Sequence, residues 1–336
     1  MLNPDQKLNN KIFEADIELK SMRAGFGEGL VIAGQMDKQV IALSADLTES
    51  TGLQAFRNKF PERFIEVGIA EQNLVTVASG MAVMGKIPFI ASYAVFSPGR
   101  NWEQIRTTIC YNNVPVKIIG THAGVNAGPD GGSHQALEDI AMMRSLPRMV
   151  VISPCDAIEA MKAVIATAKT KDPTYIRLPR EKSPVITTED TPFKIGKAQI
   201  ASRPHLEASP RGEASVGIIA TGPLLYHALV AAKKLEEEGK KVIVMNLSTI
   251  KPLDTDAIIS LAHETRGIVT VEEHQIAGGM GSAVAECLAA HFPVPIEFVG
   301  VKDQFGQSGQ ADELIEHYEM GESHIRKAVE RVMLRK

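Results

Sequence analysis

The stretch GIAEQNLVTVASGMAVMGKIPFIASYAVF, residues 68–96, holds a helical pattern over Gln72–Met84 and then an apolar run, KIPFIASYAVF, at residues 86–96. A helical pattern that alternates with short apolar, β-branched runs is typical of parallel βα units. We therefore predict a helix followed by a strand here, and an α/β fold for the region around it.

The same alternation continues on both sides of this stretch. We predict strands within KQVIALSADLT (38–48), VPVKIIGTHAG (114–124), RMVVISPCDA (148–157) and DPTYIRLPREKSP (172–184), and helices at Ile17–Ala33, Glu103–Tyr111, Ala136–Arg144 and Ala157–Ala168.

The pattern breaks around Pro184–Gly196, where the sequence is rich in Thr and contains Pro. A second alternation follows, so we predict two consecutive three-layer α/β domains with mainly parallel sheets, at residues 1–188 and 195–336. The second domain is predicted from a polar, exposed loop ASRPHLEASPRGEA (201–214), strands ASVGIIATG (214–222), VIVMNLSTI (242–250), GIVTVEEHQ (267–275) and PIEFVGVKD (295–303), and an amphipathic helix from residue 224 that ends at Gly239.

Length and composition agree with two aliphatic domains. The chain has 336 residues, 44% hydrophobic and only 5% aromatic content, and a net charge of −4. This negative net charge does not favour binding to nucleic acid. The N-terminus lacks the apolar core of a signal peptide, and no stretch is long and apolar enough to span a membrane. The three cysteines have no CxxC spacing, so we expect free thiols and a cytoplasmic location.

Ligands of open parallel sheets collect at the carboxyl ends of the strands. That rule singles out Asp46–Ser50, Glu71, Tyr93–Phe96, His122, Asp130–His134 and Arg180. Glu71 stands where a long apolar helix begins. It is either a first-turn glutamate that favours the helix dipole, or a carboxyl group in a poorly solvated pocket that shares a proton with a ligand nitrogen.

Two histidines flank the Gly-rich loop HAGVNAGPDGGSH, residues 122–134. The loop is either a turn-rich connection with incidental histidines, or a site where His122 and His134 transfer protons or bind substrate hydroxyls. A metal site is disfavoured, because the spacing is not that of a helical zinc pair. Arg23 and Arg180 could clamp a phosphate, with Ser50 as a hydroxyl donor, or they could be ordinary surface arginines.

A second Gly-rich stretch, HQIAGGMGS at residues 274–282, resembles a dinucleotide loop only superficially. It lacks the GxGxxG spacing, and the chain has no Walker A sequence. We predict that it is a structural loop entering a helix.

Five collinear motifs give a resemblance that covers essentially the whole chain. They are SADLT (44–48), RFIEVGIAEQN (63–73), GTHAGVNAGPDGGSHQALEDIAMMRSLP (120–147), RLPREKSP (177–184) and VEEHQIAGGMGSA (271–283). Together they resemble the transketolase family of thiamine-diphosphate enzymes. The resemblance implies a pyrimidine-binding domain followed by a transketolase C-terminal domain.

A full-length transketolase is about twice this size. The part that this chain lacks has a length that is ordinary for a two-layer domain. Its N-terminal domain binds the diphosphate and a divalent metal through a Gly-Asp-Gly motif, which is absent here. The resemblance therefore implies the separately encoded C-terminal subunit of a split transketolase. We expect a partner subunit that carries the Mg²⁺ ligands, and an assembly of two copies of each subunit around a two-fold axis.

The resemblance also implies a role for each matching residue. Glu71 would hydrogen-bond the aminopyrimidine of thiamine diphosphate and so promote formation of the cofactor's ylide. The ylide would take up a two-carbon ketol unit from a ketose phosphate, and the unit would then pass to an aldose phosphate. Tyr93 and Phe96 would stack on the aminopyrimidine, with Gly99 in place of a third aromatic ring, and Asp46 would contact the cofactor region across the interface. His122, Asp130 and His134 would bind donor hydroxyls and assist proton transfer, and Arg23, Ser50 and Arg180 would clamp the sugar phosphate.

Three alternatives stay open. The β subunit of a 2-oxo-acid dehydrogenase has the same two domains, but the arginines and GPDGGSHQ favour sugar phosphates. A deoxyxylulose-phosphate synthase normally carries all three domains on one chain, and SADLT fits it less well. A non-catalytic assembly subunit is disfavoured by four retained residues, Glu71, His122, Asp130 and His134. For the region from about residue 195 we expect a structural and dimerising role.

Overall fold

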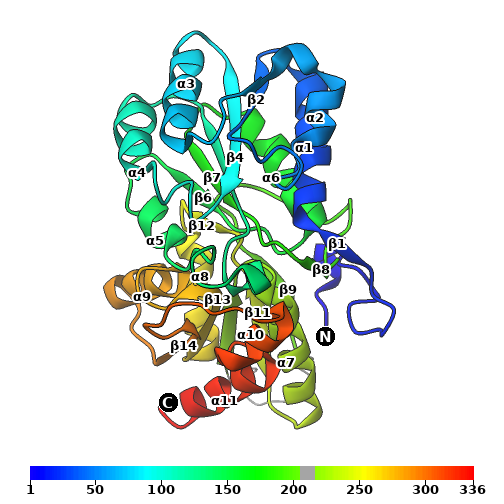
Figure 1. The fold of residues 1–336 in the computed structure, drawn as a ribbon. Helices are drawn as coiled ribbons and strands as arrows, with labels where there is room; N and C mark the ends of the chain where they lie inside the picture. Colours follow the sequence, from blue (N-terminus) through cyan, green and yellow to red (C-terminus); the bar gives the residue numbers. More distant parts are fainter. Residues whose placement is uncertain (205–215) are drawn as a thin grey trace.

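The computed structural model describes residues 1–204 and 216–336, and it contains two main sheets with helices packed on their faces (Figure 1). Each sheet is mainly parallel, which confirms the predicted fold class of two α/β units. The first sheet has the strand order β12-β6-β7-β5-β4-β2-β3, and the second has the order β14-β13-β10-β11-β9.

Six strands of the first sheet are parallel and come from the first 177 residues of the chain. They are β2 (Val40–Ser44), β3 (Phe64–Glu66), β4 (Ile87–Tyr93), β5 (Lys117–Thr121), β6 (Val150–Ile152) and β7 (Thr174–Arg177). The seventh strand, β12 (Thr249–Lys251), comes from much later in the chain and runs antiparallel to β6 at the sheet edge.

Alternate residues of strand β2 point to opposite faces of the first sheet, as the two-residue period of a strand requires. Val40 and Ala42 pack with α1 (Met22–Met36), α2 (Gln54–Lys59) and α6 (Ala157–Ala168). Ile41 and Leu43 pack with α3 (Glu71–Val83), α5 (Asp139–Arg144) and the π-helix Ile105–Tyr111 that continues α4 (Trp102–Gln104). The result is a three-layer arrangement whose core lies on both faces of the sheet.

The second sheet is built in the same way. Its parallel strands are β10 (Val216–Ala220), β11 (Val242–Asn246), β13 (Ile268–Gln275) and β14 (Ile296–Val301), and β9 (Gln199–Ser202) is antiparallel at the edge. Helices α7 (Leu224–Glu237), α10 (Ala311–His317) and α11 (Glu322–Met333) pack on one face. Helices α8 (Thr255–Thr265) and α9 (Met280–His291) pack on the other face, and their apolar cluster is continuous with that of α3 and the π-helix.

The structure corrects several predicted boundaries. The helix predicted from Ile17 begins at Met22, because residues Leu19–Ser21 form β1, which pairs antiparallel with β8 (Lys182–Pro184). Of the loop predicted at residues 201–214, the first two residues belong to β9, and residues 205–214 lie outside the described residues, as do the first two residues of the strand predicted from 214. The stretch at 274–282 is a loop that enters α9, as predicted. Short 3₁₀ helices occur at Pro4–Gln6, Pro61–Arg63 and Val125–Asp130.

Among the helices of the described residues, none combines the length and the apolar character needed to cross a bilayer.

Candidate functional site

Glu71 is the first residue of helix α3, and only 5% of it is exposed. It lies in a hollow of about 490 Å³ lined by residues 69–73 and Arg100. The side-chain amide of Asn101 donates a 2.9 Å hydrogen bond to the Glu71 carbonyl and so fixes the start of the helix. Glu71 is therefore a first-turn acid, and it is also buried beside a hollow; whether it shares a proton with a ligand nitrogen stays a prediction.

Four rings gather at the ends of strands β4 and β5. Tyr93 and Phe96 stack with their centroids 5.9 Å apart and an interplanar angle of 14°. His122 stacks on Tyr93 at 3.8 Å, and the ring of His134 stands edge-on to Phe96 at 5.5 Å. The structure thus brings together two aromatic and two imidazole rings that three separate segments of the sequence supply.

His122 directly follows strand β5 and has a left-handed backbone conformation, with φ of 55°. Its Nδ1 lies 3.0 Å from the hydroxyl of Thr121. Burial lowers the pKa of His122 to about 3, and the positive charges of Arg23 and Arg180 act in the same direction. The imidazole is therefore neutral at neutral pH, and a neutral ring can accept or donate a hydrogen bond toward a hydroxylated ligand.

The residues of the predicted phosphate clamp also contact one another, but the arginine side chains donate to backbone carbonyl oxygens of this group and of its neighbours. Arg23 donates 2.6 Å and 2.8 Å hydrogen bonds to the carbonyl oxygens of Ser50 and Arg180. Arg180 donates to the Ala127 carbonyl at 2.8 Å and to Asp130 Oδ1 at 3.3 Å. Burial lowers the pKa of Arg23, and its Nε is a buried donor without a hydrogen-bond partner in the described residues. These bonds hold both guanidinium groups in place before any ligand arrives.

Asp46 stands apart from the ring cluster. It is exposed and has φ of 61°, and across residues 1–204 and 216–336 no hydrogen bond or ion pair joins its side chain to Tyr93 or Phe96. Its backbone position is set by Glu66 at the end of β3, which accepts the amide of Asp46 at 2.7 Å and that of Gly68 at 3.1 Å. Glu66 was not among the predicted residues, although the strand-end rule applies to it too.

Arg100 is a second residue that the sequence did not single out. Its guanidinium lies 3.7 Å from the Glu71 carboxylate and 4.7 Å from the ring centroid of Phe96. Gly99 beside it has no room for a side chain, because a Cβ there would lie 1.9 Å from the carbonyl oxygen of Val95. The backbone of this turn therefore excludes a third aromatic ring at residue 99.

The part of the chain that the structure describes holds no group of three His, Cys, Asp or Glu side chains placed for a metal ion. All three cysteines, Cys110, Cys155 and Cys287, are free and buried.

Comparison with known proteins gives a consistent result over both halves. The family "Transketolase, pyrimidine binding domain" matches residues 19–185, and "Transketolase, C-terminal domain" matches residues 208–325. The chain is 41% identical over 315 residues to the "Putative transketolase C-terminal section" of Methanocaldococcus jannaschii, an alignment that covers 93% of this chain and 96% of the relative.

Two further similarities cover nearly the whole chain. The "6-deoxy-6-sulfo-D-fructose transketolase subunit SqwH" of Clostridium sp. strain MSTE9 is 36% identical over 327 residues, 97% of this chain and 99% of the relative. Among solved structures, "Split gene transketolase, inactive beta4 tetramer" matches with a TM-score of 0.85 and 40% identity, covering 94% of this chain and 99% of that chain.

Proposed function

The chain belongs to the transketolase family, and from this we propose that it is the C-terminal subunit of a heteromeric transketolase. Such an enzyme transfers a two-carbon ketol unit from a ketose phosphate to an aldose phosphate with thiamine diphosphate as cofactor. The observation that carries the proposal is the buried carboxylate of Glu71 in a hollow, beside the stacked rings of Tyr93 and Phe96.

The residues present fit the aminopyrimidine half of the cofactor. A flat ring with several nitrogens needs an aromatic face to stack on and an acceptor for a shared proton. Phe96 and Tyr93 offer the face, and the carboxylate of Glu71 offers the acceptor. When bound, the cofactor supplies the electron sink for cleavage of a carbon–carbon bond. In this proposal Glu71 holds a proton against a ring nitrogen, and Asp46 contacts the cofactor region from an exposed position.

The same chain would bind the donor sugar through polar groups at the strand ends. Arg23 and Arg180, with Ser50, would hold the sugar phosphate, because guanidinium groups already fixed by carbonyl bonds lose little entropy on binding an anion. His122, Asp130 and His134 would hold the hydroxyl groups. The neutral state of His122 suits it to donate or accept a hydrogen bond with a sugar hydroxyl near neutral pH.

We propose that a separate N-terminal subunit binds the diphosphate and its Mg²⁺, and that two copies of each subunit assemble around a two-fold axis. The names of two similar proteins, a transketolase subunit and an inactive tetramer of one split-gene chain, support a role that depends on a partner. Within this chain we propose a pyrimidine-binding domain at residues 1–188 and a C-terminal domain at 195–336. We also propose a role in pentose phosphate metabolism and a cytoplasmic location; the free thiols support the location.

Two other enzyme classes remain as alternatives to be tested. The β subunit of a 2-oxo-acid dehydrogenase would use a similar glutamate, and a deoxyxylulose-phosphate synthase would share the sugar-phosphate site. The convergence of Arg23 and Arg180 near His122 favours a phosphorylated sugar over a lipoyl-bearing partner.

The decisive test is a coupled ketol-transfer assay with xylulose 5-phosphate and ribose 5-phosphate, thiamine diphosphate and Mg²⁺. The chain is assayed alone and with its candidate N-terminal partner. Activity that appears only in the mixture and is lost with Glu71→Gln supports the proposal. A mixture that forms a stable complex but transfers no ketol unit overturns it and makes the 2-oxo-acid dehydrogenase the first alternative.

A further inference from the structure

The loop of residues 122–134 rests on the second half of the chain. The side-chain amide of Gln135 donates to the carbonyl oxygens of Val125 and Gly128 and, at 3.0 Å, to that of Gln307. A Cβ at Gly132 would lie 2.5 Å from the carbonyl oxygen of Gly306. The shape of this loop therefore depends on residues beyond the first sheet.

Glu273 of strand β13 makes the closest of these contacts. Its side chain is buried, and its Oε1 accepts a 2.6 Å hydrogen bond from the backbone amide of Asn126. Gly124 has φ of 81°, and a Cβ there would lie 2.2 Å from the same Oε1. Two separate features of the loop, a donated amide and a glycine, thus accommodate this one carboxyl group.

Asn126 links Glu273 to the segment that carries Arg180 of the proposed phosphate clamp. Its side-chain Oδ1 accepts a 2.6 Å bond from the amide of Glu181, the residue after Arg180. Arg180 in turn donates to the carbonyl of Ala127 at 2.8 Å. A displacement of Asn126 would therefore move both the loop that begins at His122 and the segment that carries Arg180.

The charge state of Glu273 is set by few groups. Burial raises its pKa to about 7, whereas the charge of Arg177 from β7 and the amide of Asn126 act in the opposite direction, and Asp139 from α5 raises it further. Arg177 donates to the backbone carbonyl of Glu273 at 2.8 Å and to Asp139 at 2.9 Å. The second oxygen, Oε2, has no hydrogen-bond partner among the described residues.

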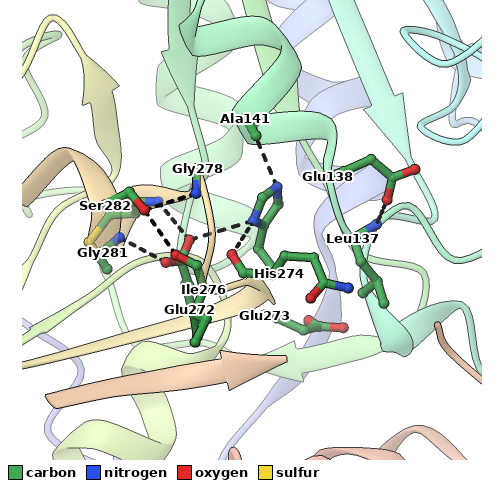
Figure 2. A network of polar contacts seen from close by, with 12 residues as sticks. Leu137, Glu138, Ala141, Glu272, Glu273, His274, Ile276, Gly278, Gly281 and Ser282 are labelled. Atoms are coloured by element: carbon green, nitrogen blue, oxygen red, sulfur yellow. Dashed lines mark hydrogen bonds and ion pairs between the residues drawn. The ribbon is translucent and has the colours of Figure 1, made fainter. Parts of the chain in front are cut away.

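The neighbouring residue, Glu272, provides a contrast on the same strand. It is equally buried, and its pKa is also raised to about 7, chiefly by burial. Its carboxylate accepts the amides of Met280 and Gly281 at 2.6 Å and 2.7 Å, where helix α9 begins. Figure 2 shows Glu272 directed to Gly281 and Glu273 directed away from it. Of these two glutamates, Glu273 is the one that accepts a hydrogen bond from the loop of residues 122–134 among the described residues.

We propose that Glu273 is a positioning residue of the ketol-transfer site: through Asn126 it holds the donor-binding loop and Arg180 in register with His122. The inference rests on the proposed function. It gives the C-terminal half of the chain a share in donor binding, beyond the structural and dimerising role that the sequence suggested.

The test uses the complete two-subunit complex with Glu273→Ala, Glu273→Gln and the matched control Glu272→Ala. Loss of a charge-assisted hydrogen bond predicts that Glu273→Ala raises KM for the ketose phosphate roughly tenfold or more. Glu273→Gln retains an acceptor for the Asn126 amide and should restore KM to within about twofold of the wild-type value. Glu272→Ala should lower stability and leave the donor KM unchanged.

Amide hydrogen exchange on the full chain gives a readout that does not require activity. The Asn126 amide should exchange faster in Glu273→Ala and at the wild-type rate in Glu272→Ala. Equal effects of the two alanine variants, or unchanged exchange of Asn126 in Glu273→Ala, would overturn the inference. If the wild-type complex transfers no ketol unit at all, the proposed function fails, and the exchange experiment still decides whether Glu273 holds the loop.

If Glu273→Ala does not fold, the pH profile of Glu273→Gln decides. Ionisation strengthens the acceptor, so the wild-type donor KM should fall as pH rises through about 7. The ratio of the Glu273→Gln value to the wild-type value should change with pH over this range. A constant ratio would contradict the positioning role.

Discussion

Glu71 and Arg100 form an ion pair of 3.7 Å between a side chain that is 6% exposed and one that is 58% exposed. The same guanidinium covers the ring of Phe96 at 4.7 Å. Arg100 therefore contacts both Glu71 and Phe96, the two residues to which we assign the aminopyrimidine of the cofactor. The guanidinium and the aminopyrimidine would compete for these two side chains.

We expect Arg100→Gln to tighten the binding of thiamine diphosphate to the two-subunit complex by up to about fivefold, because a pair this exposed is worth less than about 1 kcal/mol. Isothermal titration calorimetry checks the result. Arg106→Gln, on the adjacent π-helix, is the control and should not change the affinity. Weaker binding in Arg100→Gln would mean that the arginine assists the cofactor instead of competing with it.

Glu71→Gln should lower kcat for ketol transfer by roughly 10²–10⁴-fold, because the amide keeps the shape of the side chain but cannot take up a proton. The free energy of unfolding should change by less than about 1 kcal/mol, the usual size of a first-turn effect on a helix. The exposed Glu103→Gln serves as the control. A variant with near wild-type kcat would remove Glu71 from the chemistry.

Arg23→Lys should raise KM for a phosphorylated ketose by about tenfold or more, because a lysine cannot reproduce the planar pair of donors. A non-phosphorylated ketose should show a much smaller change, since no phosphate contact is lost. Steady-state kinetics with the two donors separates these cases. The remote Arg203→Lys is the control, and an equal loss with both donors would indicate damage to the loop and not to a phosphate site.

The buried His274 should contribute less to the free energy of unfolding in acid. Burial lowers its pKa to about 4 in the folded chain, below the unfolded value of 6.5. Its contribution is therefore complete above pH 6.5 and is lost as pH falls from 6.5 toward 4, by at most about 1.4 kcal/mol per pH unit. Glu272 and Glu273 act with the opposite sign, since their raised pKa values make stability fall as pH rises from 4.5 to about 7.

Comparison of His274→Gln with the wild type isolates the histidine from these glutamates. Urea unfolding at pH 7 and pH 5 gives the change in the free energy of unfolding on acidification. This change should be more favourable to the folded state in His274→Gln than in the wild type, and His263→Gln, at an exposed position, should behave like the wild type. The same change on acidification in His274→Gln and in the wild type would contradict the assignment.

Local signals account for the elements that were predicted well. Helix α6 has the bounds expected from the sequence, Ala157–Ala168, because its periodicity is strong and the side chain of Asp156 caps it by accepting the amide of Glu159 at 2.8 Å. The segment before α1 was predicted wrongly, because its extended shape comes from pairing with β8, more than 160 residues later. No local pattern encodes that pairing.

The same distinction applies to the candidate site. Residues at or just after strand ends, such as Tyr93 and His122, could be selected from the sequence because the strand-end rule is local. Arg100 and Glu273 could not, because their importance comes from contacts with distant residues, Glu71 for one and Asn126 for the other.

Strand β12 has a consequence for how the chain is made. Its pairing with β6 closes one edge of the first sheet, and the amide of Ser153 donates to the carbonyl of Ser248 just before it, at 2.8 Å. During synthesis the β6 edge of the first sheet therefore stays unpaired until residue 251 has left the ribosome. An unpaired edge strand can pair with other chains. A hybrid that joins halves of two relatives between residues 188 and 195 would exchange this strand as well, and should succeed only where the β6–β12 pair still matches.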